Sequence, residues 1–356
     1  MATFLMAGGG TGGHVMPGLA VARELRERGH NARFIGTERG MEAKLAPAAQ
    51  FPIDWIQIGG LKRVGLKQTL ATLGALPFSL WDAARLLDRH KPSAVFSTGG
   101  YVAGPVLLAA LWKRIPVVVM EPNAVPGFTH RRLARYVAKA LVSFEETARW
   151  FPSGRTEVTG MPIRQEFFDL PAKPREQKLT VLITGGSQGS RRLNLAAEAS
   201  WPLWNPGEVQ FIHQAGKFSY DEFRPKFEAA GVEGEIVPFF DNMPCAFSRA
   251  DLIVSRSGMS TVSEIAASGK PSILVPLPTA SDQHQLRNAE AMAAAGASRL
   301  VLDAEMTGER LVKEVRELAA SPSALENMGS AARKFARPGA AWRAAEILES
   351  FAKKRD

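Results

Sequence analysis

The chain has 356 residues, a formal net charge of +9 and a single cysteine, Cys245. Its length is ample for two domains, and its 46% hydrophobic content is typical of a globular protein with a packed core. One cysteine excludes an internal disulfide and a cysteine metal cluster, and we expect a reducing, cytoplasmic location.

The basic charge favours an anionic partner such as a lipid headgroup or a phosphorylated substrate, although it also serves solubility. Nucleic acid is the weakest candidate, because the sequence has no zinc-finger cysteines, RNP-type aromatic motif or lysine-arginine tract. The N-terminus lacks the basic and apolar segments of a signal peptide, so we expect none. Apolar runs such as residues 105–112 fall short of the roughly 20 residues of a spanning helix, so we expect no integral membrane protein.

In the first half of the chain, short apolar runs alternate with amphipathic stretches. Strands are expected at residues 3–7, 32–36, 94–97, 116–120, 140–143 and 157–159. Helices are expected between them, for example at residues 19–28 and 80–90. Apolar strands separated by helices predict a parallel, doubly wound sheet of the α/β class.

The proline- and charge-rich stretch 171–178 (PAKPREQK) then interrupts the pattern, as a linker does. A strand at 179–184 restarts it and runs into a second glycine loop, GGSQGS. Further strands are expected at residues 209–213, 235–237, 252–255, 272–275 and 299–302. The repeated strand, glycine loop and helix predict two Rossmann-like domains that face each other across a cleft. We place them at residues 1–163 and 164–337, and the alanine-rich C-terminal segment 338–356 fits either domain.

The first glycine loop, residues 7–18 (AGGGTGGHVMPG), joins the first strand to a helix. Glycines let the backbone approach an anion closely, and the N–H groups of a helix N-terminus point at it. Three glycines match the dinucleotide spacing G-x-G-x-x-G, with Glu38 as the acidic ribose ligand, which indicates a nicotinamide enzyme. These glycines are Gly8, Gly10 and Gly13. The loop is richer in glycine than that motif and also carries Thr11 and His14, and a histidine at this place indicates chemistry.

Two further turns of the first half follow predicted strands. Gly99, Gly100 and Gly104 indicate either close helix–strand packing or backbone donors for a second anion. Glu121 and Asn123 come directly after a buried strand, where binding residues of parallel sheets lie, although an Asx turn explains them as well. We favour a binding role for this pair because of its position.

In the second half, residues 255–271 (SRSGMSTVSEIAASGKP) carry the strongest signal. A helix is expected to begin near Ser260 or Thr261, where Thr261 and Glu264 match a capping box. Alternatively, a diphosphate binds the helix N-terminus, and the Glu264 carboxylate accepts hydrogen bonds from both hydroxyls of a ribose.

Three other features are each open to two interpretations. Arg164, at the domain boundary, is either a surface charge or a phosphate contact. The polar run 282–285 with Asn288 suits either sugar hydroxyls or a polar helix start. Residues 70–81 (LATLGALPFSLW) are apolar and follow several basic residues, so they form either buried core or a membrane-contacting patch with a basic rim.

Taken in order, these motifs resemble those of the MurG family of bacterial peptidoglycan glycosyltransferases. The resemblance rests on GGGTGGHVMPG, GGYVAGP, EPNAVPG, GMPIR, GGSQGS, FFDNM, RSGMSTVSEIAASGKPSILVP and DQHQLRNA, which cover nearly the whole chain. The glycine loops alone are unspecific, whereas their combination with the serine- and glutamate-bearing helix is highly specific. The sequence departs from the commonest forms of the family at Met161, Pro122, Met259 and Ser260, without losing a chemical group on which the reaction depends.

The resemblance implies a GT-B fold and an inverting transfer of N-acetylglucosamine (GlcNAc) from UDP-GlcNAc to the C4 hydroxyl of lipid I, undecaprenyl-diphospho-MurNAc-pentapeptide. The product is lipid II, so the implied process is peptidoglycan synthesis, with its part in cell-wall biogenesis, cell shape and division. The implied partners are UDP-GlcNAc, lipid I and an anionic membrane surface, with no cofactor, metal or nucleic acid. The implied location is peripheral, on the cytoplasmic face of the inner membrane. The first domain, with the C-terminal helix packed on it, would serve the acceptor and the membrane, and the second domain UDP-GlcNAc.

The resemblance also implies roles for individual residues. Uracil would contact the backbone near Phe240, and the ribose would bind Glu264. The diphosphate region would be held by Arg164, Ser187, Met259, Ser260, Thr261, Val262 and Ser263. The sugar would contact Gln285 and Asn123, with Thr11, Gly12 and Gly13 closing over it.

Inversion by a single in-line displacement needs a base that takes the acceptor proton as UDP leaves. His14 is our choice, since an unperturbed histidine titrates at about pH 6.5, and Glu121 is the alternative. Either residue is also suited to positioning without proton transfer. The sequence offers no acidic pair for a metal, so helix N-termini and Arg164 are expected to stabilise the leaving diphosphate.

Three rival functions remain in view. A UDP-GlcNAc 2-epimerase shares the two-domain architecture and would act on the sugar nucleotide alone. A nicotinamide oxidoreductase would use the first glycine loop, and a non-catalytic basic protein would use only its charge. The second glycine loop and the helix that bears Glu264 favour the transferase over the last two, because neither of them gives these features a role.

Overall fold

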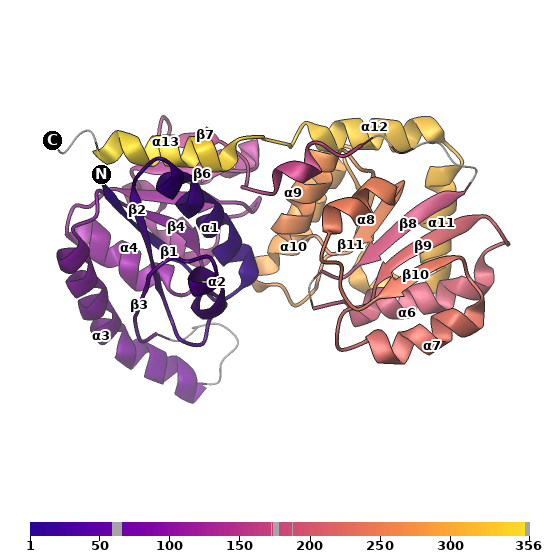
Figure 1. Cartoon of the computed structure of the whole chain (residues 1–356), viewed down its shortest axis with the longest axis horizontal. Helices are drawn as coiled ribbons and strands as arrows, with labels where there is room; N and C mark the ends of the chain where they lie inside the picture. The colour runs from indigo at the N-terminus through magenta and orange to yellow at the C-terminus, as the bar shows by residue number, and fades with distance from the viewer. Residues whose placement is uncertain (59–65, 172, 174–177, 187, 353–356) are drawn as a thin grey trace. The chain divides into compact units, whose positions relative to one another are not determined.

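The computed structural model describes residues 1–58, 66–171, 173, 178–186 and 188–352, without the side chains of residues 66–75. The chain divides into two compact units. Unit 1 comprises Met1–Ile163 and Gly339–Asp356, and unit 2 comprises Arg164–Pro338. Each unit is built around its own parallel sheet with helices on its faces (Figure 1). The prediction of two Rossmann-like, doubly wound α/β sheets is therefore confirmed.

Within the described residues, unit 1 contains a seven-stranded sheet in the order β3-β2-β1-β4-β5-β6-β7. Its strands are β1 (Thr3–Gly8), β2 (Asn31–Gly36), β3 (Ile53–Trp55), β4 (Ala94–Gly99), β5 (Val117–Glu121), β6 (Lys139–Val142) and β7 (Thr156–Val158). Its helices are α1 (Gly12–Glu27), α2 (Glu42–Ala48), α3 (Leu66–His90), α4 (Ala103–Trp112), α5 (Phe128–Leu133) and α13 (Ala340–Ala352). Strand β3 was not predicted, because this edge strand has only three residues of mixed polarity and shows no pattern.

Alternation along β1 gives unit 1 two separate apolar cores. Phe4 and Met6 point to one face, where they pack with α1 and α13. Leu5 and Ala7 point to the other face, where they pack with α3 and α4. All four side chains are buried, as expected for a central strand of a sheet covered on both faces.

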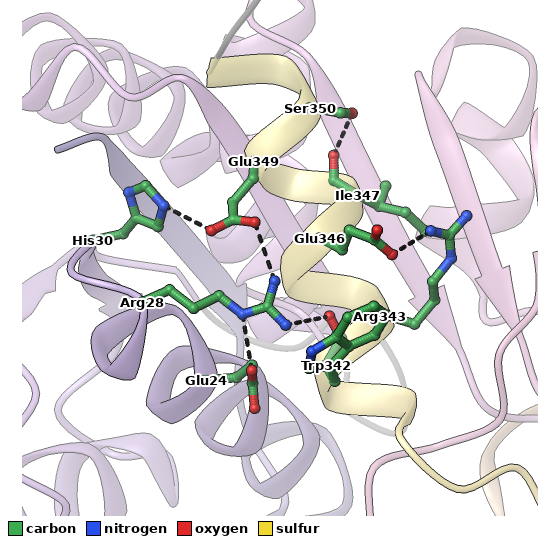
Figure 2. Close-up of polar contacts among 9 residues, drawn as sticks. All are labelled: Glu24, Arg28, His30, Trp342, Arg343, Glu346, Ile347, Glu349 and Ser350. Atoms are coloured by element: carbon green, nitrogen blue, oxygen red, sulfur yellow. Dashed lines mark hydrogen bonds and ion pairs between the residues drawn. The ribbon is translucent and has the colours of Figure 1, made fainter.

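Helix α13 joins unit 1 from the far end of the chain, and Figure 2 shows its polar contacts. Leu348 is buried in the core beneath it. Glu349 accepts from Arg28 Nη1 at 3.0 Å and lies 2.9 Å from His30 Nε2. Arg28 also donates to the Trp342 carbonyl at 3.2 Å and stacks over the Trp342 ring. Apolar and ionic contacts together therefore hold this helix on α1.

Unit 2 contains a six-stranded parallel sheet in the order β10-β9-β8-β11-β12-β13, again within the described residues. Its strands are β8 (Leu179–Thr184), β9 (Val209–Gln214), β10 (Gly234–Val237), β11 (Leu252–Ser255), β12 (Ser272–Leu274) and β13 (Arg299–Leu300). Its helices are α6 (Arg191–Ser200), α7 (Tyr220–Ala230), α8 (Met243–Arg249), α9 (Met259–Ser268), α10 (His284–Ala294), α11 (Gly308–Ala319) and α12 (Pro322–Arg333). Val181 and Ile183 of the central strand β8 lie in its main core.

Two helices begin earlier than predicted. Helix α1 begins at Gly12 rather than near residue 19, so His14 lies in its first turn. Helix α9 begins at Met259, and its N-cap is Gly258 in an extended conformation. Thr261 is then the third residue of the helix, and the capping-box interpretation of Thr261 and Glu264 is wrong. The glycine takes the cap position because it needs no side-chain partner there.

No helix among the described residues combines the length and the apolar character needed to cross a bilayer. Of the apolar segment 70–81, residues 70–75 have side chains outside the described part of the structure. Phe78 and Trp81 are exposed, whereas Leu76 and Leu80 are partly buried. In the described half of this segment, some apolar side chains therefore pack partly against unit 1, and others are exposed to solvent.

Candidate functional site

In each unit, polar loops gather where the strand order reverses, between β1 and β4 in unit 1 and between β8 and β11 in unit 2. Ligands of doubly wound sheets bind at such switch points, beyond the carboxyl ends of the strands. In unit 1 the two loops touch closely, since a Cβ on Gly100 would lie 2.2 Å from the Gly9 carbonyl oxygen. Gly100 also has a φ of +85°, so the close approach of the two loops, rather than helix–strand packing, explains this glycine.

Two hydrogen bonds to Thr98 of β4 hold His14, at the start of α1, in place at this switch point. Its Nδ1 lies 2.8 Å from the Thr98 carbonyl oxygen, and the Thr98 hydroxyl donates to the His14 carbonyl at 2.6 Å. A carbonyl oxygen only accepts, so Nδ1 carries the proton of the neutral ring and Nε2 carries the lone pair. The ring is half-buried. This arrangement presents Nε2 as the basic atom of the loop.

The residues before His14 form an open turn. Thr11 is the exposed N-cap of α1. A Cβ on Gly12 would meet nothing within 4 Å, and one on Gly13 would meet only Thr11 Oγ1, at 3.8 Å. Packing within unit 1 therefore does not require glycine at these two positions. The backbone of this turn is therefore open to close approach by a bound molecule.

Glu42 is a polar residue of this site that no motif in the sequence marks. Its carboxylate is buried and accepts from the N–H groups of Gly10 at 2.8 Å and Thr37 at 3.0 Å. A dinucleotide phosphate would need donors of this loop, and here a carboxylate already occupies one of them. Glu38, the expected ribose ligand of a nicotinamide enzyme, is exposed. The geometry therefore disfavours the nicotinamide alternative.

Glu121 is buried at the end of β5, and both of its oxygens accept hydrogen bonds. Oε1 accepts from the N–H and the Nδ2 of Asn123 at 3.1 and 3.0 Å. Oε2 accepts from the Gly127 N–H at 2.9 Å and from His130 Nδ1 at 3.0 Å. Burial alone would raise the pKa of Glu121, but these hydrogen bonds and the neighbouring imidazole bring the pKa below its ordinary value. Such a carboxylate suits the ordering of the turn that carries Asn123 better than proton abstraction.

In unit 2, Glu264 on α9 lies beside Arg164. Glu264 Oε1 is 4.0 Å from Arg164 Nη2, and the guanidinium also stacks 5.1 Å from the centre of the Phe167 ring. Burial raises the pKa of Glu264 to about 7, although the charge of Arg164 acts in the opposite direction. A carboxyl group with a strongly raised pKa near a helix N-terminus and beside a guanidinium is typical of functional sites.

The N-terminus of α9 provides the donors expected for a diphosphate. Met259, Ser260, Thr261 and Ser263 are all partly exposed, so their backbone or side chains can meet a ligand. Val262 is buried, so its side chain belongs to the core. Gln285 lies close by, because its Nε2 is 3.8 Å from the position of a Cβ on Gly258.

Gln214, at the end of β9, is a second residue that the sequence analysis missed. Its Nε2 donates to the Gly186 carbonyl at 2.9 Å, and its Oε1 accepts from the Phe240 N–H at 3.1 Å. The side chain is buried, so it ties the second glycine loop to the segment of Phe240. Ser187, the predicted phosphate contact of that loop, lies outside the described residues.

The two sets of groups suit different tasks. Unit 1 presents an imidazole whose lone pair lies on Nε2, next to an open helix N-terminus. Unit 2 presents a helix N-terminus, a guanidinium and a carboxyl group, which together match the diphosphate and ribose of a nucleoside diphosphate. No group of three histidine, cysteine or carboxylate side chains in the described part of the chain is placed to hold a metal ion.

Comparison with known proteins gives the following matches. Residues 4–142 match the glycosyltransferase family 28 N-terminal domain, and residues 180–343 match the C-terminal domain of the same family. A UDP-N-acetylglucosamine--N-acetylmuramyl-(pentapeptide) pyrophosphoryl-undecaprenol N-acetylglucosamine transferase of Solibacter usitatus is 59% identical over 354 residues, 99% of this chain and 97% of that protein. The transferase of the same description from Halorhodospira halophila is 43% identical over 360 residues, 98% of each chain.

Solved structures are similar over the same span. The crystal structure of Acinetobacter baumannii MurG matches with a TM-score of 0.86 and 31% identity, over 98% of this chain and all of that one. A UDP-N-acetylglucosamine 2-epimerase matches with a TM-score of 0.66 and 13% identity, over 100% of this chain and 98% of that one. At that identity the epimerase shares the fold alone, and its likeness does not extend to activity.

Proposed function

Because this chain belongs to the family of UDP-N-acetylglucosamine--N-acetylmuramyl-(pentapeptide) pyrophosphoryl-undecaprenol N-acetylglucosamine transferases, we propose that it transfers GlcNAc from UDP-GlcNAc to lipid I and forms lipid II. The reaction is a step of bacterial peptidoglycan synthesis. The observation that carries the proposal is the 59% identity over 99% of the chain. The two switch-point sites add a chemical reason, since one suits a nucleoside diphosphate and the other a proton acceptor.

In this proposal, unit 2 holds the donor. The diphosphate binds the N-terminus of α9 at residues 259–263, where the partial positive charge of the helix stabilises it, and Arg164 adds a full charge. The ribose hydroxyls donate to Glu264. Uracil contacts the backbone of Phe240. The Phe240 N–H donates to Gln214, and this hydrogen bond fixes the position of that backbone segment. Gln285 contacts the sugar from beside Gly258.

Unit 1 supplies the groups that activate the acceptor. The C4 oxygen of the acceptor sugar attacks C1 of GlcNAc while the bond from C1 to the diphosphate oxygen breaks. His14 Nε2 takes the proton of the C4 hydroxyl, since Nδ1 is occupied by the Thr98 carbonyl. UDP leaves with the bonding electrons, and the resulting charge is stabilised in unit 2. Asn123 contacts the sugar, and residues 11–13 close over it.

The test measures UDP release from UDP-GlcNAc with and without a lipid I analogue. We expect UDP to appear only with the acceptor, in a one-to-one ratio with a lipid product that has gained one GlcNAc. UDP release that is independent of the acceptor, or conversion of UDP-GlcNAc to its C2 epimer, would contradict the proposal and favour the epimerase.

We further propose that the chain acts at the cytoplasmic face of the inner membrane and attaches peripherally through α3 and α4. These helices pack against each other and carry the exposed side chains Phe78, Trp81 and Trp112. Arg85 stacks over Trp81, and Lys113 lies over Trp112. Aromatic rings with cationic neighbours suit the boundary between acyl chains and anionic headgroups, where lipid I also lies.

Changing Phe78, Trp81 and Trp112 together to serine is expected to weaken binding to phosphatidylglycerol vesicles by at least about tenfold, since each ring contributes roughly 1.5–3 kcal/mol when fully buried. The three side chains are 71%, 59% and 78% exposed, so the melting temperature should stay unchanged. Vesicle co-sedimentation checks the binding. Phe218→Ser, an exposed aromatic of unit 2, is the matched control. Unfolding of the triple variant would instead place these rings in the core.

Gln214→Leu is expected to raise the KM for UDP-GlcNAc by about tenfold with little change in kcat, because a buried hydrogen-bonding pair is lost and two donor-binding loops separate. The Gly186 carbonyl and the Phe240 N–H each lose their partner. Gln210→Leu, on the same strand, is the control. Steady-state kinetics with varied donor check the result, and an unchanged KM would mean that the two loops hold their places without Gln214.

A further inference from the structure

Three buried polar side chains lie near the carboxyl-terminal edge of the sheet in unit 1. Ser97 is on β4, Glu121 ends β5, and His130 is on α5. None is more than 3% exposed. Burying a polar group costs free energy unless it is hydrogen-bonded, so a cluster of three needs an explanation. The proposed transfer takes no proton through any of them.

Hydrogen bonds link these side chains into one chain. His130 Nδ1 lies 3.0 Å from Glu121 Oε2, and His130 Nε2 lies 3.1 Å from Ser97 Oγ. A carboxylate only accepts, so Nδ1 is the donor. With the proton of the neutral ring on Nδ1, Nε2 accepts from the Ser97 hydroxyl, and Ser97 Oγ in turn accepts from the Gly99 N–H at 3.2 Å. The bonds therefore run in one direction from Gly99 to Glu121, and bonds in such a chain strengthen one another.

One end of this chain supports His14. The Thr98 carbonyl, between Ser97 and Gly99, accepts from His14 Nδ1 at 2.8 Å. A Cβ built on Gly99 would lie 3.4 Å from the His14 ring and 3.5 Å from His130 Cε1. His14 and His130 therefore flank the same glycine, and a shift of His130 would move the peptide that holds His14.

The other end supports Asn123. Glu121 Oε1 holds the N–H and the Nδ2 of Asn123, while Oε2 holds the Gly127 N–H. The remaining bond to Oε2 comes from His130. Without it, the carboxylate loses one of its two side-chain donors, and the turn that presents Asn123 loses part of its support.

We infer that His130 is a positioning residue for the transfer, which ties the end of β4, with His14, to the end of β5, with Asn123. The inference rests on the proposed function and adds a residue to it. Ser97, His130 and Glu121 are also hydrogen-bonded in the arrangement serine, histidine, carboxylate, which is that of the catalytic triad of many hydrolases. Ser97 is 0% exposed, however, and its Oγ is engaged by Gly99 and His130, so a substrate carbonyl cannot reach it.

The test compares three variants. His130→Leu keeps much of the ring volume without its hydrogen bonds, and Ser97→Ala removes only the far end of the chain. His130→Asn retains an amide that donates to Glu121 from nearly the position of Nδ1. We expect His130→Leu to lower kcat by about 10- to 100-fold, because small misplacements of reacting groups cost rates of that order. Ser97→Ala and His130→Asn each keep the bond to Glu121 and lose the bond to Ser97, so the kcat of both variants should lie between that of His130→Leu and that of the unaltered enzyme.

Two further readouts separate positioning from a general loss of structure. The Kd of UDP should stay unchanged in every variant, because its proposed contacts all lie in unit 2. The imidazole ¹⁵N chemical shifts of His14 should report a proton on Nδ1 in the unaltered protein and a mixture of tautomers in His130→Leu.

Unaltered kcat in both His130→Leu and Ser97→Ala would overturn the inference, and so would an equal loss in His130→Asn and His130→Leu. If His130→Leu does not fold, Ser97→Ala decides: a lowered kcat with unchanged UDP affinity supports the inference, and a normal kcat overturns it. If the unaltered enzyme shows no acceptor-dependent UDP release, the proposed function fails, while the tautomer of His14 still tests whether His130 positions it.

Discussion

His14→Ala is expected to lower kcat by about 10²–10⁴-fold, the usual contribution of a general base, with little change in the Kd of UDP. The physical reason is the hydrogen bond from Nδ1 to the Thr98 carbonyl, which leaves Nε2 as the proton acceptor of the neutral ring. UDP affinity should persist because the proposed nucleotide contacts lie in unit 2. Steady-state kinetics with a lipid I analogue give kcat, and calorimetric titration with UDP gives the Kd.

His90→Gln is the matched control for this prediction. His90 is also a histidine of unit 1, but it ends α3 and pairs with Asp54 at 2.9 Å. It should keep a normal kcat. If His14→Ala also turned over within twofold of the unaltered enzyme, His14 would have no part in proton transfer. If His14→Ala also lost affinity for UDP, the proposal that UDP binds unit 2 while unit 1 activates the acceptor would be wrong.

The second large effect concerns the pH dependence of donor binding. Burial raises the pKa of Glu264 to about 7, against the pull of Arg164. The ionised carboxylate accepts from both ribose hydroxyls, whereas the protonated form keeps less acceptor capacity, so binding favours the ionised form. Affinity for UDP-GlcNAc should therefore be highest above pH 7 and fall as the pH falls. Between pH 8 and pH 6 the ionised fraction drops about tenfold, and we expect the Kd to rise by a similar factor.

The measurement is titration with UDP-GlcNAc in the absence of acceptor, because its diphosphate diester has no proton to gain in this range. Glu264→Gln should bind weakly at pH 8 and show little change with pH. Glu228→Gln, an exposed glutamate of α7, should behave as the unaltered protein. A pH dependence that survives in Glu264→Gln would assign the titration to another group.

Much of the fold could be predicted because apolar runs mark its central strands. The predicted strand at 179–184 matches β8, and the one at 252–255 matches β11, since each is a continuous buried run bounded by polar residues. The start of α1 was missed because glycines read as a loop, and here two of them lie in its first turn. A Cβ at Gly12 or Gly13 would meet little or nothing, so packing within unit 1 does not dictate these glycines.

The supporting residues of the site could not be predicted from local patterns. Glu42 bonds to a backbone group 32 positions away, and Gln214 bonds to one 26 positions away. His130 joins Ser97, 33 positions before it. Each read as an ordinary helix or strand residue, because only the parallel sheet brings the ends of distant strands to one edge. His14, Glu121 and Glu264 could be proposed from the sequence because they stand directly within motifs.

In the proposed reaction, one enzyme moves GlcNAc from UDP to lipid I in a single in-line displacement. Isolating the lipid product after turnover gives its mass and the anomeric configuration of the new linkage. We predict one added GlcNAc, joined at C4 of the acceptor sugar with configuration opposite to that in UDP-GlcNAc. A linkage of retained configuration would exclude a single displacement, and an unmodified acceptor beside epimerised UDP-GlcNAc would exclude the transfer itself.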